Sequence, residues 1–149
     1  MMGIDLELAD SAAAVYRLRA CADAGPACVH DPDCGENVQR IRAAAAADRP
    51  DEVYPWEFRY RRFADINVAM RLAGMGYAGE SEPGRPGIPA RNLESNDRTL
   101  VTAREIDEAL AAYAVAPVEF RTALEADRKW VAWLAWLAVA RKHGGFEAE

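Results

Sequence analysis

The eleven residues from Trp130 to Ala140, WVAWLAWLAVA, are all apolar and lie between Lys129 and Arg141. A helix that crosses a bilayer needs roughly 20 such residues, so this run is too short to span a membrane. A helix that is apolar on every side is normally buried in the centre of a domain. The run therefore predicts a central helix around which the rest of the chain packs.

Trp130, Trp133 and Trp136 spread over a broader face of this helix than one side of a core requires. Two interpretations follow. In the first, all three indoles belong to the core. In the second, part of the face is a surface for a partner or a second copy of the chain, because Trp is favoured as an interface anchor.

The length of 149 residues suits one ordinary hydrophobic core and is too short for two. Hydrophobic residues make up 51% and charged residues 28% of the chain, which is typical of globular proteins. We therefore expect residues 1–149 to form a single, mainly α domain, a bundle of about five helices. Periodicity and breakers place these helices at about 11–24, 36–48, 56–74, 102–116 and 117–143, and Gly144-Gly145 suits a cap at the end of the last one.

Two local signals sharpen this outline. In VTAREI, Thr102 as N-cap and Glu105 three residues later form a capping box, flanked by Val101 and Ile106 as a hydrophobic staple. In IDLEL, Ile4–Leu8, apolar and acidic residues alternate, which predicts a short strand as a minor β component, although one helix over 5–24 is a competing interpretation. A lone strand needs a partner, which either Phe146 and its neighbours or the 74–98 segment would have to supply.

Residues 74–98 contain five Gly and three Pro, and no regular element fits them. Structureless segments of this length are usually functional lids or disordered. Trp56, Tyr60 and Asn67 precede the segment on the predicted 56–74 helix, so one hypothesis is a small-molecule pocket beneath a 74–98 lid. The other explanation for Asn67 is that its buried amide ties down a backbone segment.

All cysteines lie in CADAGPACVHDPDCG, residues 21–35. Cys21, Cys28, His30 and Cys34 are the four ligands that a tetrahedral zinc site needs, but the paired C-x2-C spacing of specific zinc motifs is missing. Cys34 as a reactive thiol with His30 as its base is opposed by the surrounding acids, which raise a thiol pKa. The default interpretation is a loop with no cofactor, and zinc is the alternative.

The net charge of −6 disfavours nucleic-acid binding, which needs clustered cations. The N-terminal residues show no signal-peptide pattern and no phosphate-binding or hydrolase motif is visible, so we expect a cytoplasmic protein without a catalytic constellation.

Three stretches, MGIDLEL, SNDRTLVTAREIDEAL and WLAWLAVARKHGGFE, resemble small uncharacterised proteins of high-GC actinobacteria and their phages. The resemblance implies no activity and no residue role.

The sequence thus favours a non-enzymatic, cytosolic interaction or accessory protein that acts through a helical face, by self-association or with a protein partner. The alternatives are a small-molecule-binding protein or enzyme with a pocket under residues 74–98, and a zinc-stabilised domain.

The cysteine segment generates the first prediction. We expect the purified, untagged protein to contain no zinc by elemental analysis, and its thiols to titrate without prior removal of a metal. A stoichiometric amount of zinc, with thiols that react only after a chelator removes it, would instead identify Cys21, Cys28, His30 and Cys34 as a metal site.

Overall fold

The computed structural model describes residues 4–9, 53–54, 57–60, 63–94 and 99–148. The elements, in chain order, are β1 (Ile4–Leu8), β2 (Val53–Tyr54), β3 (Glu57–Tyr60), α3 (Phe63–Leu72), β4 (Gly76–Tyr77), β5 (Ile88–Pro89), α4 (Arg91–Glu94), β6 (Leu100–Val101), α5 (Ala103–Ala114), α6 (Val118–Glu125), α7 (Arg128–Ala140), a short 3-10 helix η2 (Arg141–His143) and β7 (Phe146–Ala148). The prediction of a mainly helical chain is confirmed, with five α-helices among the described residues. The helices predicted at 11–24 and 36–48 lie outside them.

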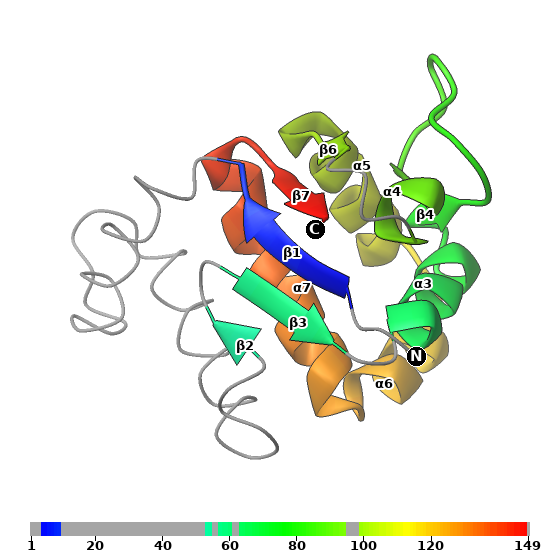
Figure 1. Ribbon diagram of the computed structural model, residues 1–149. Coiled ribbons are helices and arrows are strands. Elements are labelled where there is room, and N and C mark those ends of the chain that lie inside the picture. The colour runs from blue at the N-terminus through cyan, green and yellow to red at the C-terminus, as the bar shows by residue number, and fades with distance from the viewer. Residues whose placement is uncertain (1–3, 10–52, 55–56, 61–62, 95–98, 149) are drawn as a thin grey trace.

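The predicted N-terminal strand is also confirmed, and it has two partners. The larger sheet has the order β2-β3-β1-β7-β6, and all of its pairings are antiparallel (Figure 1). Leu6 lies opposite Phe58 of β3 on one side and opposite Ala148 of β7 on the other. The Phe146 segment, one of the two expected sources, therefore supplies a partner for β1.

One face of this sheet packs on α7, which lies behind it in Figure 1. Leu6, Leu8 and Phe146 are fully or almost fully buried, whereas Glu7 between the two leucines is half-buried, as the two-residue period of a strand requires. The ring of Phe58 meets Trp133 at a centroid distance of 5.3 Å, and Phe146 meets Trp136 at 5.0 Å, both in edge-on geometries. Such pairs are favoured by the ring quadrupoles.

The helix predicted over 56–74 begins later, at Phe63, because residues 57–60 form β3. Glu57-Phe58-Arg59-Tyr60 alternates charged and aromatic residues, which is the two-residue period of a strand. The sequence predicts a helix here because apolar residues also recur at helical spacing over 56–74. Pairing with β1 and burial of Phe58 decide in favour of the strand. The helix predicted over 117–143 is likewise divided into α6 and α7, because Asp127 accepts a hydrogen bond from the backbone N–H of Lys129 and caps α7.

The capping box at the start of α5 is present. The backbone N–H of Glu105 donates to Thr102 Oγ1 at 3.2 Å, and the backbone N–H of Thr102 donates to Glu105 Oε1 at 3.0 Å. Val101 and Ile106, the two residues of the expected staple, are fully buried. This helix therefore begins where local sequence chemistry alone places it.

Residues 74–98, for which the sequence predicts no element, contain β4, β5 and α4. The stretch between Tyr77 and Gly87 projects from the molecule, at the right of Figure 1, and is exposed. Within this stretch, the backbone N–H of Glu82 donates to the Tyr77 hydroxyl at 3.1 Å, and the Arg85 guanidinium lies 4.2 Å from the centre of the Tyr77 ring. The N–H of Gly87 donates to Glu108 Oε2 of α5 at 3.1 Å, which attaches the C-terminal end of the stretch to α5.

Gly144 and Gly145 end the helical segment, as the sequence predicts, and both have left-handed φ angles of 78° and 97°. The N–H of Gly145 donates to the Ala140 carbonyl, and its own carbonyl accepts from Ala9 N–H, each at 2.9 Å. The two glycines thereby turn the chain from η2 into β7, beside β1 and β6.

These two glycines provide a matched test of the turn. A Cβ at Gly145 would collide with the Val101 carbonyl oxygen, whereas at Gly144 the nearest atom is the Ala9 Cβ at 3.9 Å. Both Ala variants bear the left-handed strain of about 1–2 kcal/mol. Because only Gly145→Ala adds the collision, it should lower the free energy of unfolding clearly more than Gly144→Ala. Urea denaturation measures the difference, and equal losses would contradict the close approach to β6.

Candidate functional site

The structure describes only some of the predicted site residues. Cys21, Cys28, His30, Cys34 and Trp56 lie outside the described residues, and Tyr60 ends strand β3. Among the residues that are described, no group of three or more His, Cys, Asp or Glu side chains could hold a metal ion. Nor does any helix in the described ranges have the length and apolarity needed to cross a membrane.

Asn67 is buried, with 3% of its surface exposed. Its Nδ2 donates to the Ala90 carbonyl at 3.4 Å and to Glu94 Oε1 at 3.2 Å. The side chain therefore connects α3 to the segment of β5 and α4, which is the second of the two roles that the sequence suggested for it.

The three tryptophans of α7 are core residues. Trp130, Trp133 and Trp136 are 3%, 0% and 0% exposed, and Trp133 Nε1 donates to the sulfur of Met70 at 3.1 Å. Buried in this way, the three indoles offer a partner almost no contact area. A surface with more exposed apolar area would lie elsewhere on the molecule.

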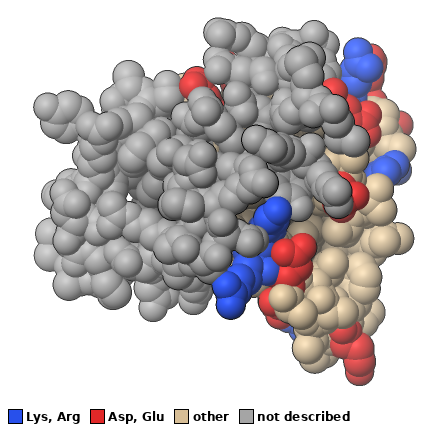
Figure 2. Space-filling model, turned by 60° about the horizontal axis from the view of Figure 1, so that its bottom comes forward, with Lys and Arg blue, Asp and Glu red and all other residues tan. Residues whose placement is uncertain are grey.

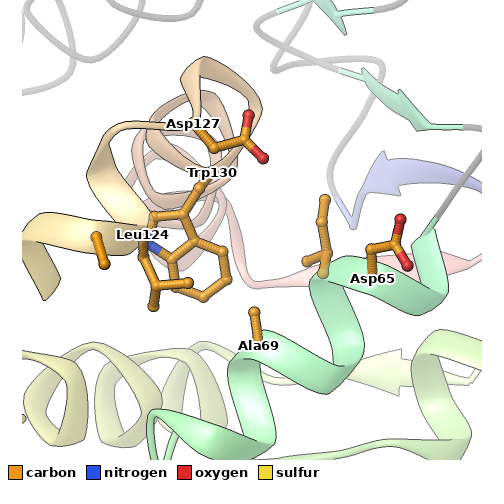
Figure 3. A pocket seen from close by; sticks show the side chains of 7 residues that line it. Asp65, Ala69, Leu124, Asp127 and Trp130 are labelled. Carbon is orange, nitrogen blue, oxygen red and sulfur yellow. The ribbon is translucent and has the colours of Figure 1, made fainter. Parts of the chain in front are cut away.

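A pocket of about 270 Å³ opens between α3, α6 and the start of α7. Its lining is mostly apolar, with one carboxylate from α3 and one from the turn before α7 (Figure 3). The lining residues are Asp65, Ile66, Ala69, Ala123, Leu124, Asp127 and Trp130. In Figure 3 the indole of Trp130 lies beside Leu124 and faces Ala69, so it forms the inner wall of the pocket.

The orientation of this indole is fixed from behind. Trp130 Nε1 donates to the Tyr113 hydroxyl at 3.3 Å, and that hydroxyl donates to the Arg121 carbonyl at 3.5 Å. The rings of Tyr113 and Trp130 lie 5.8 Å apart. Because the indole N–H is engaged with Tyr113 of α5, Trp130 presents hydrocarbon surface to the pocket.

The two carboxylates give the pocket a negative edge. Asp65 is exposed in the first turn of α3, and within the described part of the chain no hydrogen bond or ion pair engages its side chain. Asp127 uses Oδ1 to cap α7, which anchors its side chain at the pocket. The lining includes no Lys, Arg or His. A ligand that combines a cation with hydrocarbon would match this combination of groups.

Apolar side chains continue from the pocket onto the surface of α3. Val68 and Leu72 are 46% and 70% exposed. Val68 follows Asp65 by three residues and Leu72 follows Ala69 by three, so they lie on the same side of the helix. Across the pocket, α6 buries none of its residues, although Phe120 and Leu124 pack partly against the core. Figure 2 brings this side of the molecule forward and shows an uncharged area with both acidic and basic side chains at its margins. We call the outer surfaces of α3 and α6 around the pocket the α3–α6 face.

Sequence reasoning did not find this pocket. Asp65 lies on α3, which the sequence predicts as part of a helix that begins at residue 56. Asp127 lies in the turn between α6 and α7, which the sequence predicts as one continuous helix. The N-cap residue Asp127, followed by Arg128 and Lys129, was the one local signal for a new helix start. Comparison of the chain with protein-family models, curated proteins and solved structures gives no match.

The Tyr113–Trp130 pair generates a pH prediction. Burial raises the pKa of Tyr113 above its ordinary value of 10.0, although the hydrogen bond from Trp130 opposes the shift. The unfolded chain therefore loses this proton at a lower pH than the folded protein, and the stability due to the neutral phenol falls as pH rises above about 10.

Tyr113→Phe should lower the free energy of unfolding by about 1–3 kcal/mol at pH 8, because Trp130 loses its acceptor. Above pH 10 the difference in free energy of unfolding between the variant and the natural protein should become smaller. Urea denaturation at pH 8 and above pH 10 measures this difference, and a difference that stays constant or grows would contradict the raised pKa of Tyr113.

Proposed function

We propose that the protein is a non-enzymatic interaction protein that binds a partner chain through the α3–α6 face. The observation that carries this proposal is the position of Val68 and Leu72, which expose apolar surface beside an open, largely apolar pocket. Exposed apolar patches with polar margins are typical of protein-binding sites. The face thus takes the place of the tryptophan surface that the sequence suggested.

Charge favours a different protein over a second copy of this chain. A two-fold symmetric dimer would bring the α3–α6 face of one copy against that of the other. Asp65 and Asp127 would then approach the same residues of the partner copy, in a chain whose net charge is already −6. Like charges brought together at an interface are unfavourable.

A selection of random displayed peptides on the natural protein tests the proposal. Leu72→Gln removes exposed apolar surface without changing the net charge, and Val115→Gln does the same at an 85% exposed position on the α5–α6 connection. The selected peptides should bind Leu72→Gln about tenfold more weakly, equivalent to about 1.4 kcal/mol. Their affinity for Val115→Gln should equal that for the natural protein, as measured by fluorescence anisotropy.

Two results would overturn the proposal. Equal binding to all three proteins would place the interaction on another surface. Sedimentation that shows a dimer of the natural protein, and a monomer for Leu72→Gln, would assign the face to a second copy of the chain.

A further inference from the structure

We infer that the pocket of the α3–α6 face receives an arginine side chain of the partner. This inference rests on the proposed function, since it names the residue by which a partner would be recognised there. Three properties of the pocket support it: its size, its apolar wall and the placement of its two carboxylates.

The volume of about 270 Å³ suits one side chain. Sites for small molecules and cofactors usually measure about 300–1,000 Å³ and enclose most of the ligand. A pocket at the lower limit of that range, open at the surface of two helices, matches the single deep anchor that many protein interfaces use. Arg is among the residues enriched as such anchors.

The wall matches the hydrocarbon stem of an arginine. Ala69, Ala123 and Leu124 are the partly or fully exposed apolar residues of the lining, and they offer aliphatic surface to methylene groups. Trp130 is 3% exposed and closes the inner end of the pocket, with its indole N–H engaged by Tyr113.

The carboxylates provide the acceptors. Asp65 comes from α3, and Asp127 comes from the turn between α6 and α7, so two separate elements bring negative charge to one opening (Figure 3). The hydrogen bond from Lys129 N–H holds Asp127 in position before any ligand arrives. Arg128 and Lys129 follow Asp127 in the chain, but neither lines the pocket. A planar guanidinium has five donors in a fixed fork, which matches the acceptor geometry of carboxylates.

Two probes that differ only in charge test the inference. N-acetyl-arginine amide carries the guanidinium, and N-acetyl-citrulline amide has a neutral urea of nearly the same shape. In an NMR titration of the labelled full chain, the arginine probe should shift the Trp130 indole N–H and the backbone amides of 65–69 and 123–127. The citrulline probe should bind at least about fivefold more weakly, the upper range of an exposed ion pair, and added salt should reduce the difference.

Variants locate the charge that is responsible. Asp65→Asn and Asp127→Asn each remove one carboxylate, and Asn preserves the helix cap at position 127. Asp107→Asn changes the net charge equally at an exposed site on α5, where Asp107 pairs with Arg141 at 3.3 Å. Each pocket variant should weaken the arginine probe by about threefold to fivefold, and Asp107→Asn should leave it unchanged.

The outcomes separate this inference from the proposed function. Equal binding of the two probes, or an equal effect of Asp107→Asn, would overturn the arginine assignment. If the displayed peptides still depended on Leu72 but tolerated replacement of every arginine by citrulline, the α3–α6 face would stand and the arginine pocket would fall. If the peptides bound Leu72→Gln and the natural protein equally while the arginine probe bound as expected, the pocket would be a site for a free guanidinium compound. The proposed partner-binding function would then be wrong.

Discussion

Strand β1 is the constraint on which the rest of the described structure depends. It forms hydrogen-bonded ladders on both edges, with β3 and with β7, and so joins segments from distant parts of the chain. Its apolar residues Leu6 and Leu8 face the core, where the aromatic residues of β3 and β7 meet the indoles of α7. Without β1 between them, β3 and β7 would have no ladder in common, and the surface that buries α7 would be divided.

The same helix connects this core to the pocket. Trp133 and Trp136 are enclosed beneath the sheet, whereas Trp130, one turn earlier, is covered on one side by Tyr113 and lines the pocket on another. Trp133 also reaches the sulfur of Met70, which lies on the same helix, α3, as the pocket residues Ile66 and Ala69. The relative placement of α3 and α7 is therefore set by core packing, and these two helices form part of the pocket wall.

Local chemistry was sufficient to predict some elements from the sequence. The capping box of α5, the alternation of β1 and the glycines after η2 depend on neighbouring residues, and all three are present. Strand β3 was missed because its identity depends on pairing with β1, which short-range periodicity cannot detect. The pocket was missed for a related reason: Asp65 and Asp127 are far apart in the sequence and are brought together only by the break between α6 and α7.

The register that places Leu6 opposite Ala148 also bears on how the protein is made. During translation β1 emerges long before β7 exists, and a sheet dominated by such distant pairings forms slowly. In that interval an apolar strand with open edges is a template for aggregation. Asp5 and Glu7 alternate with Ile4, Leu6 and Leu8, so every second position of the waiting strand carries a carboxylate. Charges placed between the apolar residues of a strand are the feature that limits its association with other strands, and Asp5 and Glu7 occupy these positions in β1.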